Sequence, residues 1–125
     1  MDKTEFRTLR KRLSRTQKQI AHLLGVSLKA VHSYEQGWRT VPPAVERHLF
    51  FLVSLARTVV PATLCWDARG CPPERRAECP ASQFGRGDLC WLVNGTFCNG
   101  SEQDSWESKM NTCRSCPVFT SRIPL

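Results

Sequence analysis

The sequence predicts a mainly α-helical protein in which a small helical domain is followed by a small, irregular, cysteine-rich domain. Apolar residues recur at helical spacing through the first 60 positions, and all seven cysteines lie after position 64. The net charge of +7 also belongs to the first half, where eleven Lys and Arg residues stand against four acidic ones. A chain of 125 residues has room for two such domains. We expect them to cover residues 1–60 and 64–120.

Two helices are predicted in the first 25 residues. Each carries an apolar stripe at a spacing that places side chains on one helix face. The stripes are Phe6, Leu9 and Leu13 in the first helix and Ile20, Ala21 and Leu24 in the second. The second helix is expected to begin near Ser14. Gly25 is expected to end it, because glycine adopts the positive φ of a helix C-terminus at little steric cost.

Two further helices are predicted before residue 60. Ser27 is expected to cap the third by accepting a bond from a free backbone N–H, and Gly37 to end it. Pro43 suits the first turn of a fourth helix, which we expect to run to about Arg57 and to be closed by Pro61.

The fourth predicted helix carries more apolar surface than one buried face needs. Its inward stripe is Val45, Leu49 and Leu52, and the additional apolar residues are Phe50, Phe51, Val53 and Leu55. A helix that is apolar nearly all round is buried on more than one side. We therefore expect it to dock the cysteine-rich domain, to form a homodimer interface, or to do both.

Residues 16–37, TQKQIAHLLGVSLKAVHSYEQG, form the most specific pattern of the first half. A Thr-Gln pair opens the second helix, Leu-Gly-Val-Ser forms the turn, and Tyr-Glu-x-Gly closes the third helix. Over about residues 5–58 the chain resembles the Cro/C1-type (Xre-like, lambda-repressor-like) helix-turn-helix DNA-binding family. The resemblance implies a double-stranded DNA operator, bound in this family by two-fold homodimers.

The resemblance also implies which side chains touch DNA. Gln17 matches a phosphate-contacting glutamine of the family, and the residues at the start of the third helix face base edges in the major groove. Lys29 can donate to guanine, and Leu28 can contact a thymine methyl. The DNA-contacting candidates are Gln17, Lys18, Ser27, Leu28, Lys29, His32, Ser33 and Arg39. His32 is open to two roles, a base contact or a solvated helix residue, and the second is favoured.

The second half is defined by its cysteines: Cys65, Cys71, Cys79, Cys90, Cys98, Cys113 and Cys116. The N-terminus is polar and carries no secretory pattern, so we expect a cytoplasmic protein without a membrane segment. In that compartment such a cysteine density favours metal or redox chemistry over structural disulfides. An odd number also prevents complete pairing within one chain. Cys113-x-x-Cys116 has the spacing at which two thiolates share one metal ion.

The cysteine context resembles a bacterial module, the two-CW domain, over about residues 64–120. The resemblance is carried by the pairs Cys65-Trp66, Cys71-Pro72, Cys79-Pro80 and Cys90-Trp91, and by the Cys113-x-x-Cys116 motif. The module also occurs attached to sensory and signalling proteins, which implies a possible sensory partner. It has no established function that could be carried over.

Three chemistries stay open for the cysteines. An iron–sulfur cluster, in the first place a 4Fe-4S cluster, or a zinc ion would each take four thiolates. All seven cysteines are candidate ligands, of which a subset is expected to bind. The third possibility is a metal-free thiol–disulfide switch. In secondary structure we expect a strand at Leu89–Val93, a helix over Ser105–Asn111, and loops elsewhere in this half.

The favoured hypothesis is a transcription regulator whose first domain binds an operator and whose second senses redox state, oxygen or metal. One alternative keeps DNA binding and makes the second domain a structural zinc module or a protein-docking surface. Another alternative is an electron-transfer or thiol-redox protein in which the helices serve assembly. No phosphate loop, nucleophile elbow or carboxylate pair is present, so we expect no enzyme and no catalytic residues.

Overall fold

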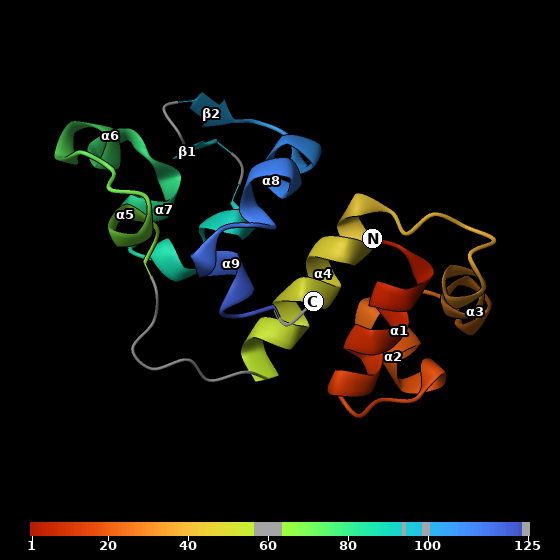
Figure 1. Cartoon of the computed structure of the whole chain (residues 1–125). Helices are drawn as coiled ribbons and strands as arrows, with labels where there is room; N and C mark the ends of the chain where they lie inside the picture. Colours follow the sequence, from red (N-terminus) through yellow and green to blue (C-terminus); the bar gives the residue numbers. More distant parts are fainter. Residues whose placement is uncertain (57–63, 94, 99–100, 124–125) are drawn as a thin grey trace. The chain divides into compact units, whose positions relative to one another are not determined.

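The computed structural model of the protein describes residues 1–56, 64–93, 95–98 and 101–123. The described residues fall into two compact units, one within residues 1–56 and the other within residues 64–123. Helices dominate both units (Figure 1), which confirms the predicted mainly α class. No helix in these described ranges has the length and apolar character needed to cross a bilayer. Pro61, the predicted stop of the fourth helix, lies outside the described residues.

The N-terminal unit consists of α1 (Lys3–Arg12), α2 (Gln17–Leu24), α3 (Leu28–Gln36) and α4 (Pro43–Ala56). α1 and α2 each pack against α3 and against α4. Most residues of the predicted apolar stripes are buried, and Phe6, Leu9 and Ile20 are completely inaccessible to solvent. Leu13 and Leu52 are only partly buried, and the buried side of α4 includes Phe50 and Val53. The Phe6 ring packs against Tyr34 of α3, with ring centroids 5.5 Å apart.

The second helix begins later than the expected start near Ser14. Thr16 caps α2 by accepting a bond from the Gln19 backbone N–H at 3.1 Å, and the Gln19 side chain accepts from Thr16 N at 2.9 Å. This capping box satisfies two backbone donors at once. Ser14 instead lies in the turn before it, with φ of +55°.

The predicted end of the second helix and both predicted ends of the third are confirmed, and α4 begins at Pro43 as expected. Arg57, the expected end of the fourth helix, lies outside the described residues. Gly25 and Gly37 follow α2 and α3 in the left-handed conformation, with φ of +69° and +77°. Ser27 caps α3 by accepting a bond from Ala30 N at 3.0 Å. These caps position α3 because they fix where it begins and where the chain leaves it.

The C-terminal unit is a set of short elements: α5 (Cys65–Ala68), α6 (Pro73–Glu78), α7 (Pro80–Gln83), the 3-10 helix η1 (Gly87–Leu92), β1 (Thr96–Cys98), β2 (Ser101–Gln103), α8 (Trp106–Cys113) and α9 (Pro117–Thr120). η1 packs against α5, α7, α8 and α9. Its buried Trp91 meets Phe119 of α9 edge to face, with centroids 5.6 Å apart. η1 is therefore the centre of this unit.

The predicted strand at Leu89–Val93 is wrong, because η1 covers most of that segment. A short apolar run cannot distinguish a strand from a buried helical turn. Here the adjacent residues Cys90 and Trp91 are both buried, which an alternating strand would not produce. The strands in the described part of this unit are β1 and β2, which pair antiparallel with Phe97 opposite Glu102.

The expected helix over Ser105–Asn111 is confirmed as α8, which Ser105 caps by accepting a bond from Ser108 N at 3.1 Å. The expected loops elsewhere are wrong, since α5, α6, α7 and α9 occupy part of them. α7 and α9 each begin with a proline that directly follows a cysteine. Proline is favoured at the first helical position, so these Cys-Pro pairs act as helix starts.

Candidate DNA-reading surface and cysteine pocket

The third helix presents two distinct faces. Ala30, Val31 and Tyr34 are buried, whereas Leu28, Lys29 and His32 are exposed. The exposed residues follow the cap Ser27, which is also exposed. The N-terminal turns of α3 therefore display four of the predicted DNA contacts on one solvent-facing surface.

Ser33 is not part of this surface. Its exposed fraction is 7%, because it lies three residues after Ala30 and one before Tyr34, on the face that packs into the unit. A hydroxyl in that position is unavailable to a base edge in this arrangement. The prediction of a direct DNA contact by Ser33 is therefore corrected.

Gln17 belongs to a polar network that joins three helices. Its amide donates to the Glu35 carboxylate, which also accepts a hydrogen bond from Arg10 Nε at 2.6 Å. Arg7 in turn donates to the Glu35 backbone carbonyl at 3.3 Å. Glu35 is buried, so the network holds α1 and α2 against α3. Gln17 is thus a positioning residue for the helix pair as well as a candidate phosphate contact.

Lys18 and Arg39 are exposed, as a phosphate contact requires. Lys18 lines a shallow depression on the α2 side of the unit, together with Arg15, Gln19, His22 and Leu23. The Arg39 guanidinium lies over the Tyr34 ring, 5.6 Å from its centroid. Lys18 therefore lies on α2, and Arg39 lies close to the C-terminal end of α3.

The sequence reasoning missed Trp38. This indole is 72% exposed and meets the His32 ring edge to face, with centroids 5.5 Å apart. The sequence feature that could have identified it is its position: a large aromatic side chain directly after Gly37, which ends the third helix. The contact makes Trp38 a neighbour of the proposed base-reading residues.

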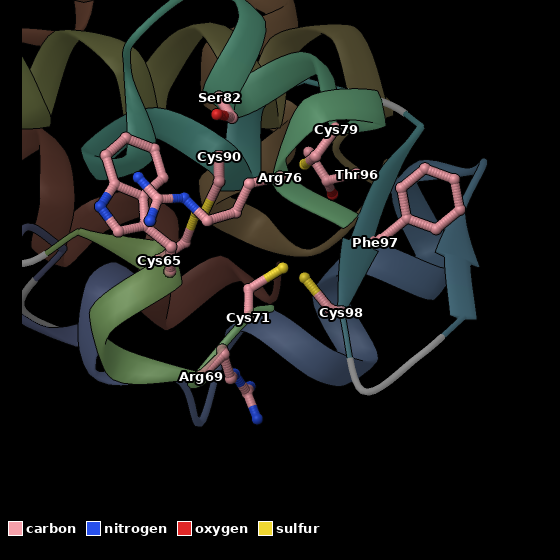
Figure 2. A pocket seen from close by; sticks show the side chains of 11 residues that line it. Cys65, Arg69, Cys71, Arg76, Cys79, Ser82, Cys90, Thr96, Phe97 and Cys98 are labelled. Atoms are coloured by element: carbon pink, nitrogen blue, oxygen red, sulfur yellow. The ribbon is translucent and has the colours of Figure 1, made fainter. Parts of the chain in front are cut away.

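Five of the seven cysteines line one pocket in the C-terminal unit, as Figure 2 shows. They are Cys65, Cys71, Cys79, Cys90 and Cys98. The cavity has a volume of about 20 Å³, which is the space of one water molecule or one ion. Cys113, at the end of α8, and Cys116, just before α9, are buried but do not line it.

The described cysteines do not converge as a set of metal ligands. Among residues 64–93, 95–98 and 101–123, no three His, Cys, Asp or Glu side chains are arranged to hold a metal ion. All seven cysteines are free thiols.

Cys65 and Cys90 are in side-chain contact in the pocket. A hydrogen bond from Cys90 lowers the pKa of Cys65 to about 7. The same contact, together with burial, raises the pKa of Cys90. Cys65 is partly exposed, whereas Cys90 is buried, so the thiol that ionises more readily is also the accessible one.

The sequence reasoning also missed Lys109, which is completely buried on α8. Its ammonium donates to Thr96 Oγ1 at 2.6 Å, and no ion pair joins it to a described carboxylate. Burial lowers the pKa of Lys109, and four cysteines act in the opposite direction: Cys113, Cys90, Cys98 and Cys79. A buried cation is costly unless an anion compensates it, so this lysine favours ionised sulfur around it.

Trp66 brings the Cys65 helix against η1. Gly87 of η1 makes room for the indole, since a Cβ there would lie 2.7 Å from a Trp66 ring carbon. On another part of the ring, the Arg76 guanidinium stacks 4.8 Å from the centroid. The neighbouring Cys65 is consequently held next to Cys90.

Comparisons with protein-family models, with curated proteins and with solved structures found no match for this chain.

Proposed function

We propose that this protein is a transcription regulator that binds double-stranded DNA through α3 and senses redox state or metal through its cysteine-rich unit. The observation that carries the DNA-binding part is the exposed N-terminal face of α3, held by α1 and α2 through the Glu35 network. A helix held this way and projecting its first turns outward suits the major groove. The +7 charge of the first half supplies attraction to phosphate.

Each exposed group has a chemical role in this proposal. Lys29 donates to guanine O6 or N7, and Leu28 packs against a thymine methyl. Lys18 and Arg39 contact phosphates on either side of the reading helix. Trp38 adds an apolar surface beside His32. Ser33 has no direct role, because it is buried.

Lys29→Ala is expected to weaken binding to a recognised duplex by about 1–3 kcal/mol, because one base contact is lost. The duplex is first selected from a random-sequence pool with the wild-type protein. Fluorescence anisotropy at one fixed salt concentration then measures the affinity for the selected duplex and for a scrambled one. The loss should be larger on the selected duplex.

Lys18→Ala is the matched control, because it removes a lysine that is proposed to touch only phosphate. It should weaken binding to both duplexes by a similar factor. Equal losses on both duplexes for Lys29→Ala would mean that Lys29 does not read bases.

For the cysteine-rich unit, the proposal includes a thiolate-bound cofactor, either a 4Fe-4S cluster or zinc. Support comes from the five cysteines that line one pocket and from buried Lys109, whose cation suits an anionic thiolate centre. Zinc in a purely structural role is the second candidate, because a tetrahedral zinc ion also takes four thiolates. Bound zinc would supply folding energy, and a bound cluster would supply redox chemistry.

Anaerobic purification followed by metal analysis separates these cofactors. A brown protein with about four irons per chain indicates a cluster, and a colourless protein with stoichiometric zinc indicates the structural role. If the purified protein contains neither iron nor zinc, sensing is limited to thiol–disulfide chemistry. We further propose that the protein acts in the cytoplasm, where DNA and reduced thiols occur together.

The proposal also includes a homodimer on a two-fold operator. Phe50 and Val53, which suggested an interface, are buried, while Leu55 of α4 is 65% exposed. Phe50→Asp would therefore place a carboxylate in a buried position, and Leu55→Asp is the better test. Sedimentation at micromolar concentration should find a wild-type dimer and a folded Leu55→Asp monomer. A wild-type monomer with and without the selected duplex would exclude the dimer.

A further inference from the structure

Two cysteines of the pocket, Cys65 and Cys90, are in side-chain contact. Cys65 and Cys90 are hydrogen-bonded to each other, while no three described ligand side chains are arranged around a metal position. The two cysteines come from different elements, α5 and η1, and Figure 2 shows both among the side chains that line the pocket. Thiols in hydrogen-bond contact need little movement to form an S–S bond.

We propose that Cys65 and Cys90 form a reversible dithiol–disulfide site that exchanges with low-molecular-weight disulfides of the glutathione type. The chemistry itself concerns only the C-terminal unit. Its regulatory meaning rests on the proposed function, in which this unit controls DNA binding.

The different exposures of the two thiols set the order of events. Cys65 is partly exposed at the pocket, so its thiolate reaches an external disulfide first. Cys90 is buried directly behind it and is therefore the resolving thiol.

The exchange balances as two successive displacements. The Cys65 thiolate attacks one sulfur of glutathione disulfide, whose S–S bond breaks and releases one glutathione thiolate. Cys90 then gives its proton to the released thiolate and attacks the Cys65 sulfur, which displaces the second glutathione. The two protein thiols are oxidised by two electrons, and the glutathione disulfide is reduced to two thiols.

The surroundings hold the two thiols of this pair in place. Trp66 holds Cys65 in place because Gly87 leaves space for its ring. Buried Lys109 acts electrostatically on both members of the pair and favours the ionised sulfur of each. Cys113 and Cys116 lie outside the pocket that an external disulfide would enter.

Mass spectrometry after oxidation tests the pair directly. The full-length protein is reduced, treated with oxidised glutathione in the presence of EDTA, alkylated and digested with trypsin. Cys65 is the sole cysteine of peptide 58–69, and Cys90 shares peptide 87–109 with Cys98. We expect a disulfide between these two peptides that disappears on reduction and re-forms on reoxidation.

Three variants assign the bond. Cys98→Ser is the matched control and should keep the cross-link, whereas Cys65→Ser and Cys90→Ser should each lose it. Cys65→Ser changes a partly exposed residue, so it tests the pair even if Cys90→Ser does not fold. The proposal is overturned if Cys65 remains alkylated after oxidation, or if its main partner is a cysteine other than Cys90.

The outcome is distinguishable from failure of the proposed function. If the cross-link forms but the protein binds no duplex, the dithiol site is supported and its role in transcription is excluded. If the protein binds DNA but forms no cross-link, the proposed DNA-binding function is supported and the dithiol site is excluded.

Discussion

Arg10→Met is expected to lower the free energy of unfolding of the N-terminal unit by about 3–5 kcal/mol, because it leaves the Glu35 carboxylate buried without its ion-pair partner. Arg10 Nε lies 2.6 Å from Glu35 Oε1, and both side chains are largely shielded from water. Gln17 would remain as a neutral donor to Glu35, which cannot replace the lost charge. The effect should be concentrated in α1, α2 and α3, which the network joins.

Amide hydrogen exchange read by mass spectrometry measures this effect separately for each unit. Peptides from α3 should lose protection in Arg10→Met, while those from α8 should keep it. Arg12→Met is the matched control, since Arg12 lies on the same helix but is exposed. Similar protection of α3 in both variants would show that the buried pair contributes little.

Oxidation of the cysteine-rich unit is expected to change the affinity for the selected duplex by about 5–150-fold, the usual size of coupling between two sites. In the proposed function, the cysteine-rich unit changes its structure with the chemical state of its cysteines, because metal binding and folding are coupled in small domains of this kind. Disulfide formation or loss of a metal would therefore alter it throughout. In the proposed dimer, a small change in the spacing of the two reading helices is sufficient to alter operator affinity.

The measurement compares one preparation in three states: reduced, oxidised with glutathione disulfide, and oxidised then reduced again. Each is titrated against the selected duplex at the same salt concentration, because phosphate contacts make every affinity depend on salt. Thiol counting verifies that the cysteines have changed state. Identical affinities in the reduced and oxidised states would leave the cysteine-rich unit with a structural or docking role.

In the N-terminal unit the fold follows closely from local sequence. Apolar spacing predicts the buried faces of the helices, and Gly25, Ser27 and Gly37 define helix ends through groups within a few residues. The start of α2 differs because Thr16 and Gln19 form a capping box that Ser14 lacks. The exposed N-terminal face of α3 was predictable for the same reason, apart from Ser33. Its burial depends on which helices pack against α3.

In the C-terminal unit the sequence by itself determined where the cysteines lie and which helix Ser105 caps. Only the tertiary structure decided which thiols meet and that Lys109 lies among them. The physical reason is that these contacts join segments far apart in the chain. Cys65 reaches Cys90 through the packing of Trp66 on Gly87, and Lys109 reaches Thr96 from another element. Such pairings depend on three-dimensional packing, which residue spacing does not encode.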